Sequence, residues 1–123
     1  MSVIVTDTGF AEDDWAGPVA DLTSDADPAG LAALLEAPLV RVAFPGFADG
    51  RGFTLAARLR RLGYRGRLRA AGHVIADQYA MARRAGFDEV EIDAALSARQ
   101  PEDQWLARAD WRAGDYRARL RGA

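Results

Sequence analysis

Short apolar runs alternate with amphipathic stretches through the middle of the chain. Residues 39–44, 67–71 and 89–92 have the apolar or alternating patterns typical of strands. Between them, residues 53–62 and 74–85 carry apolar side chains at helical spacing. Strands that alternate with single helices pair in parallel through right-handed crossovers. The pattern therefore predicts an α/β fold whose small sheet contains at least three parallel strands.

The two predicted helices end in the same way, which supports a repeated unit. Arg60-Arg61-Leu62-Gly63-Tyr64 returns as Arg83-Arg84-Ala85-Gly86-Phe87, 23 residues later. Glycine followed by an apolar residue is typical of a Schellman-type helix end. In the first helix, Leu55, Leu59 and Leu62 are expected to form the buried stripe, and Arg60 is expected to lie at the surface.

The flanking segments are read from shorter patterns. Residues 3–5 and 19–22 are expected to be strands that extend the sheet, and Asp27-Pro28 is a typical helix start. A C-terminal helical segment is expected to begin at Pro101. We predict one domain over 1–123. It would comprise an acidic N-terminal portion, 1–38; a strand–helix core, 39–93; and a C-terminal helical segment, 94–123.

Composition narrows the function classes. The 123 residues are half apolar, carry a net charge of −2 and lack lysine, so all 16 cationic side chains are arginine. Residues 1–40 hold eight acidic residues and no arginine, whereas 41–84 hold ten arginines and two acidic residues. The acidic arm could neutralise the basic block, or the arginines could bind an anionic ligand. We expect a cytoplasmic protein that binds neither nucleic acid nor membrane.

The chain has no cysteine and a single histidine, His73. Cysteine-ligated clusters, cysteine-based zinc sites and thiol redox chemistry are therefore excluded within these residues. We expect no metal site and no intrinsic cofactor, so a redox role would need a borrowed cofactor.

A candidate ligand site follows from the predicted parallel sheet, because ligands bind at the carboxyl ends of such strands. Three loops would meet there, and they carry the candidate anion- or ligand-binding residues Asp49, Gly50, Arg51, Gly52, His73, Asp77 and Gln78. The glycines could adopt positive φ beside a helix N-terminus, and Arg51 would add a fixed charge. Alternatively, Asp49 satisfies backbone donors in a turn while Arg51 pairs with Asp77 or Asp93. His73 could act as an acid–base group or as a structural residue.

Trp111 and Tyr116 are candidate partner-binding residues.

A longer string carries a resemblance. Asp49-Gly50-Arg51-Gly52-Phe53-Thr54-Leu55-Ala56, Gly63-Tyr64-Arg65-Gly66-Arg67-Leu68-Arg69-Ala70 and Gly72-His73-Val74-Ile75-Ala76-Asp77-Gln78 follow one another, and Arg84-Ala85-Gly86-Phe87-Asp88 closes the match. This string resembles the bacterial family catalogued as domain of unknown function 934, most strongly over residues 38–93. Members of that family are described as oxidoreductases involved in sulfite reduction, largely because their genes lie beside assimilatory sulfite reductase.

The resemblance implies a pathway rather than a mechanism. We expect an accessory or anion-binding protein of assimilatory sulfite reduction that acts with sulfite reductase or its electron donor. The alternative is a small enzyme that acts on an anionic sulfur or phosphorylated metabolite at the Arg51/His73/Asp77 edge. A third alternative is a homodimer in which this edge is only a subunit contact, and the sequence leaves open whether the chain is an enzyme.

Overall fold

The computed structural model describes residues 2–112, which form six strands and six short helices. The strands are β1 (Ser2–Thr6), β2 (Gly9–Ala11), β3 (Ala20–Leu22), β4 (Leu39–Phe44), β5 (Arg67–Gly72) and β6 (Glu89–Asp93). The α-helices are α1 (Arg51–Arg61), α2 (Tyr79–Ala85), α3 (Ala94–Arg99) and α4 (Glu102–Leu106), and two 3-10 helices are η1 (Pro28–Leu34) and η2 (Ala76–Gln78).

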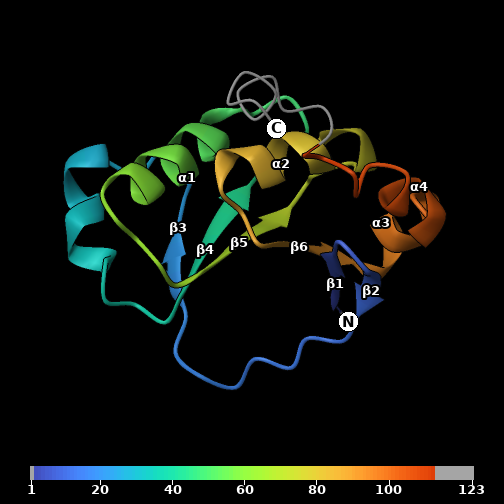
Figure 1. Ribbon diagram of the computed structural model, residues 1–123, viewed down its shortest axis with the longest axis horizontal. Coiled ribbons are helices and arrows are strands. Elements are labelled where there is room, and N and C mark those ends of the chain that lie inside the picture. Colours follow the sequence, from blue (N-terminus) through green and yellow to red (C-terminus); the bar gives the residue numbers. More distant parts are fainter. Residues whose placement is uncertain (1, 113–123) are drawn as a thin grey trace.

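All six strands belong to one sheet with the order β2-β1-β6-β5-β4-β3 (Figure 1). The pairs β3–β4, β4–β5 and β5–β6 are parallel, whereas β1 runs antiparallel to both β6 and β2. The predicted α/β class, the three central parallel strands and the extension of the sheet by N-terminal strands are therefore confirmed. Strand β2 was not predicted, whereas α3 lies within the predicted C-terminal helical segment, 94–123.

Both predicted Schellman ends are present, at Gly63 and Gly86. These glycines have φ angles of +100° and +119°, in the region that favours glycine. The Tyr64 amide donates to the Leu59 carbonyl and the Phe87 amide donates to the Ala82 carbonyl, each at 3.0 Å. The sequence motif that ends both helices therefore forms the same structure twice. The aromatic residue after each glycine is buried.

Details of the helices differ from expectation. Helix α1 begins at Arg51 rather than at 53, and the second predicted helix begins as η2 before α2 continues it. Asp27 caps the helix that starts at Pro28, as expected, but this helix is of the 3-10 type. Leu62 is 48% exposed, so the predicted stripe is wrong at its last position, whereas Leu55 and Leu59 are buried.

Arg60 was expected to be an ordinary surface residue, and this is wrong. Its guanidinium donates to the carbonyls of Tyr64, Gly66 and Gly86 at 2.9–3.0 Å and to the Asp88 carboxylate at 2.9 Å. These acceptors lie in the loops after α1 and α2, which neighbour each other only in the folded chain.

One apolar core lies between the sheet and its helices. Val40, Val42, Leu68, Ala70 and Val90 point from the strands into this core, and buried residues of α1, α2, α3 and α4 complete it. On the other face of the sheet, no helix packs among the described residues. Instead, the segment between β2 and β3 passes beneath the sheet, on the side away from α1 and α2 (Figure 1).

In the C-terminal segment, Trp105, Ala109, Ala113, Tyr116 and Leu120 have the spacing of one helical face, but Gly114 and the off-face Trp111 argue against one unbroken helix. Trp105 is buried, but α4 ends at Leu106. Positions 113, 116 and 120 lie outside the described residues. Among the helices of residues 2–112, none has both the length and the apolar character that a membrane span requires.

Candidate functional site

The carboxyl ends of β4, β5 and β6 bring the predicted candidate loops to one edge of the sheet. The loop after β4 contacts the segment after β5, because the Gln78 side-chain amide donates to the Phe47 carbonyl at 2.7 Å. The rings of Phe47 and His73 pack edge to face with their centroids 5.1 Å apart. The His73 amide also donates to the Phe44 carbonyl at 2.9 Å, which fixes the start of its loop against β4.

Arg51 is held by its close neighbour Asp49. The Arg51 guanidinium makes two hydrogen bonds to the Asp49 carboxylate, at 2.8 and 2.9 Å, and a third to the Ser24 hydroxyl at 3.1 Å. These guanidinium contacts, together with the Arg51 backbone amide, lower the pKa of Asp49 well below its usual value. The expected turn in which Asp49 satisfies a backbone donor is present, but the expected partners of Arg51, Asp77 and Asp93, are wrong.

The two glycines that flank Arg51 do not act through positive φ. Gly50 precedes α1 with a φ of −87°, and an added Cβ would meet open space there. Gly52 lies inside α1, where an added Cβ would approach the Phe44 ring to 2.5 Å. Gly52 is therefore needed so that α1 can pack closely on β4, and neither glycine has the conformation expected of an anion-binding loop.

Asp77 and Gln78 connect loops rather than line a cavity. The Asp77 carboxylate accepts a hydrogen bond from Arg108 at 2.7 Å, which ties the start of α2 to the segment after α4. The Gln78 side chain also accepts from the Ile75 amide at 3.0 Å. Both residues thus hold the loop geometry after β5.

His73 and Arg51 line two different pockets. His73 lines a pocket of about 150 Å³ with Ser2, Asp93 and Arg99. One oxygen of the Asp93 carboxylate already has a structural role, because it accepts a hydrogen bond from the Leu96 amide at 2.7 Å and so caps α3. Arg51 lines a separate pocket of about 380 Å³ between η1 and α1. The structure therefore places Arg51, His73 and Asp77 along one edge, as predicted, but not in one cavity.

Trp111, a predicted partner-binding residue, is held within the chain. Its indole NH donates to the Asp7 carboxylate at 3.2 Å, and its ring lies 4.7 Å from the Arg83 guanidinium carbon. Asp7 accepts from Tyr79 and Arg83 as well. Burial alone would raise the pKa of the Asp7 carboxyl, but the donors Tyr79, Arg83 and Trp111 outweigh burial and lower this pKa below its usual value. Tyr116, the other predicted partner-binding residue, lies outside the described residues.

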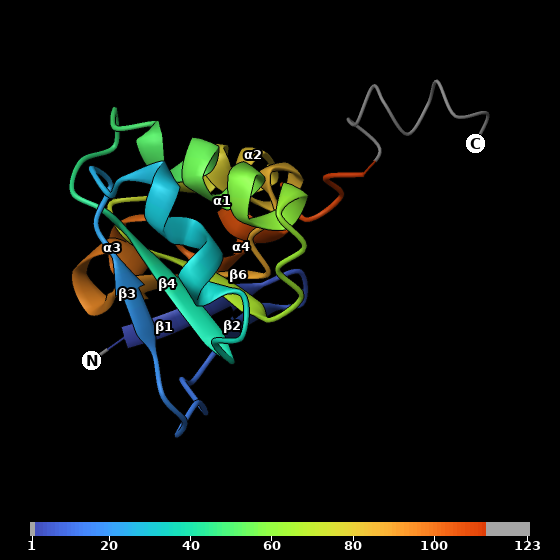
Figure 2. The ribbon, with the colours of Figure 1, turned by 90° about the vertical axis from the view of Figure 1, so that its left-hand side faces the viewer.

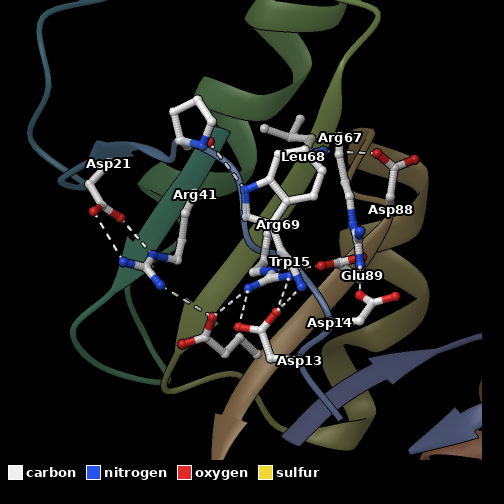
Figure 3. A network of polar contacts seen from close by, with 12 residues as sticks. Asp13, Asp14, Trp15, Asp21, Arg41, Arg67, Leu68, Arg69, Asp88 and Glu89 are labelled. Carbon is white, nitrogen blue, oxygen red and sulfur yellow. Dashed lines mark hydrogen bonds and ion pairs between the residues drawn. The ribbon is translucent and has the colours of Figure 1, made fainter. Parts of the chain in front are cut away.

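An extensive charge network lies on the sheet face opposite the helices (Figure 3). Neutralisation of the basic block by the acidic arm was one of the two interpretations of the sequence, but the individual pairs were not predicted. Arg69 is only 1% exposed, and its guanidinium bonds Glu89 at 2.5 Å, Glu91 at 2.9 Å and both oxygens of Asp13 at 3.1 Å. Arg69 lowers the pKa of Asp13 through these bonds.

The arginines beside Arg69 complete this network. Arg67 bonds Glu89 at 2.6 Å and lies 5.6 Å from the Trp15 ring, while Arg41 bonds Asp21 at 2.6 Å. The alternation of arginines in β5 and of glutamates in β6 was the available signal, since alternate positions of paired strands share one face.

The described residues form no cluster of side chains that could ligate a metal ion. Across residues 2–112, no three histidine, aspartate or glutamate side chains lie close enough to hold a metal ion together.

Comparisons with known proteins found one family. The model of a family described as "Bacterial protein of unknown function (DUF934)" matches residues 20–120. Comparisons with curated proteins and with solved structures gave no significant match.

Proposed function

The chain belongs to the DUF934 family of bacterial proteins, and we propose that it is an accessory, anion-binding protein of assimilatory sulfite reduction. In this proposal it binds sulfite reductase or the electron donor of that enzyme, and it does not carry out the reduction alone. The pathway comes from the resemblance over residues 38–93, whose family members are described as sulfite-reduction proteins.

One observation favours binding over catalysis: the candidate groups of the carboxyl edge do not converge. Arg51 is paired with Asp49, Asp77 is paired with Arg108, and His73 faces a different pocket from Arg51. A catalytic site needs its acid–base and anion-binding groups around one reacting atom.

The composition supports the same proposal. With no cysteine and one histidine, the 123 residues offer few ligands for a cluster or haem, so electrons would have to travel through a partner. The alternative, a small enzyme, would use the His73 pocket, whose lining residues include Arg99 as a fixed positive charge.

The deciding experiment measures binding and activity separately. Immobilised, purified full-length chain is offered purified assimilatory sulfite reductase and, separately, its purified electron donor, while the absorbance spectrum of the chain is recorded. Binding of either protein by a colourless chain that turns over no substrate alone would support the proposal. A chain that transforms sulfite or another sulfur anion without a partner would overturn it.

A genetic test addresses the pathway itself. Deletion of the gene should impair growth on sulfate or sulfite as sole sulfur source, and added cysteine should restore growth. Unimpaired growth of the deletion strain on both sulfur sources would remove the chain from sulfite reduction.

A further inference from the structure

A groove runs along the seam between η1 and α1, which lie next to each other on the same side of the sheet (Figure 2). It consists of two adjoining pockets, of about 380 and 210 Å³, that share Pro28 and Arg58 in their linings. Leu31 and Leu62 give the smaller pocket an apolar lining, and Arg61 stands beside them. The smaller pocket thus combines apolar and basic side chains, whereas the larger pocket also contains the carboxylate of Asp25.

The basic side of the groove is one face of α1. Arg51, Arg58 and Arg61 all line the groove, and they are separated by seven and three helical positions, which brings them to one side of the helix. At a rise of about 1.5 Å per residue they span about 15 Å. An extended peptide of about five residues has the same length, since each residue adds about 3.3 Å.

Two of the three arginines in this groove, Arg58 and Arg61, are not neutralised by a carboxylate of the described residues, whereas Arg51 is paired with Asp49. Arg65, Arg84 and Arg99 also form no ion pair within residues 2–112, but they do not line the groove. Arg41, Arg60, Arg67, Arg69 and Arg83 all form ion pairs with carboxylates. Arg58 and Arg61 are exposed and form no ion pair with any residue of the range 2–112. Their place near the end of α1 suits the helix dipole, but the dipole does not account for the apolar lining beside them.

We propose that the η1–α1 groove binds an acidic segment of a partner protein. One apolar side chain of that segment lies over Leu31 and Leu62, and flanking carboxylates bond Arg58 and Arg61. Arginine favours carboxylates because its planar guanidinium donates two parallel hydrogen bonds. An apolar anchor within a charged rim is the usual composition of a protein-binding surface. Residues 113–123 of the chain itself hold three arginines and one aspartate, so their charge does not suit this groove.

The first test depends on no assumption about the pathway. The ¹⁵N-labelled full chain is titrated with the synthetic peptide acetyl-Glu-Asp-Leu-Asp-Glu-amide and with its uncharged analogue acetyl-Gln-Asn-Leu-Asn-Gln-amide. We expect chemical-shift changes that concentrate on the amides of Leu31, Arg58, Arg61 and Leu62, with the charged peptide binding at least tenfold more tightly. Shifts centred elsewhere, or equal binding of the two peptides, would overturn the proposal.

Charge reversal provides the matched control. The double variant Arg58→Glu/Arg61→Glu should weaken peptide binding at least tenfold. The control variant Arg84→Glu should stay within twofold of wild type, because Arg84 is also an exposed arginine in the last turn of a helix but lies outside the groove. Circular dichroism confirms that each variant is folded. Equal effects of the double variant and the control would mean that only net charge matters, which contradicts a specific groove.

The choice of partner for the second titration rests on the proposed function. This titration uses purified sulfite reductase and its purified electron donor. If wild type binds one of them and the double variant binds at least tenfold more weakly, both proposals stand. If wild type binds neither while the peptide results hold, the groove stands and the proposed function fails. If wild type and the double variant bind equally, the groove is wrong as the docking site. Dimerisation of wild type that the double variant abolishes would make a second copy the occupant and overturn a heterologous partner.

Discussion

Replacement of Arg60 by alanine removes four hydrogen bonds that join α1 to the loops after both repeat units. Three of them end on the carbonyls of Tyr64, Gly66 and Gly86, and the fourth ends on Asp88. A hydrogen bond of this kind contributes about 1 kcal/mol net, so the three carbonyl bonds together contribute about 3 kcal/mol. The Asp88 pair adds no more than ~1 kcal/mol, because the Asp88 side chain is 45% exposed.

We therefore expect Arg60→Ala to lower the free energy of unfolding by about 3 kcal/mol. In urea, with a slope of about 1.5 kcal/mol per molar, the midpoint should fall by roughly 2 M. The neighbouring Arg61→Ala is the matched control, because Arg61 is exposed on the same helical turn, and its loss should stay within about 0.5 kcal/mol.

A third variant separates charge from geometry. Arg60→Lys keeps the positive charge but loses the planar fork that reaches carbonyls in several directions, so it should recover less than half of the loss. Urea unfolding followed by circular dichroism measures all three variants. Equal losses for Arg60→Ala and Arg61→Ala would refute the reasoning, and full recovery by lysine would show that the charge alone matters.

Three further predictions concern the core, the pH dependence and the carboxyl edge. Leu59→Ala should destabilise by about 2–5 kcal/mol, since Leu59 is fully buried, whereas Leu62→Ala should stay within about 0.5 kcal/mol; similar losses in urea would contradict the burial of this stripe. The lowered pKa of Asp7 means that its stabilisation is complete above the unfolded-state pKa of about 3.9 and is lost as the pH falls through the lower folded-state value. The stability difference between wild type and Asp7→Asn should therefore be full at neutral pH and close below about pH 4, and a difference that grows on acidification would exclude this linkage. Arg51→Ala should melt close to wild type, because the Arg51 side chain is 61% exposed and Asp49 keeps its bond to the backbone amide of residue 51, and it should impair growth on sulfate if the carboxyl edge is functional. A clearly lowered melting temperature would instead make Arg51 a structural residue.

The sequence predicted the strands and helices whose patterns are local. The three parallel strands follow from apolar or alternating patterns, and both helix ends follow from a glycine and the aromatic residue after it. Strand β2 was missed because its three residues lack an apolar run, and its place is set by pairing with β1. Leu62 was assigned to the core by spacing alone, but the chain leaves the helix there and Tyr64 fills the buried position after the turn.

The candidate site was predictable as a location but not as a set of contacts. Parallel strands place the loops of Asp49 and His73 at one edge, and the sequence suffices for that step. Which carboxylate holds Arg51 was not predictable, because a partner two residues away competes with Asp77 and Asp93 across the fold. The local partner, Asp49, forms the bonds, since α1 begins immediately at Arg51 and the turn before it aligns the two side chains.

The topology of the sheet explains why the acidic N-terminal residues meet the arginines of the strands. Strands β2 and β3 lie at opposite edges of the sheet, five strand spacings or about 24 Å apart, and the nine residue steps from Ala11 to Ala20 reach about 30 Å. The connecting segment must therefore cross the sheet almost fully extended, and this brings Asp13 and Asp14 onto the arginines of β5. The acidic N-terminal arm neutralises the arginines of the strands because the topology stretches it across them. Arg58 and Arg61 lie on α1, on the other side of the sheet, so this acidic segment does not neutralise them.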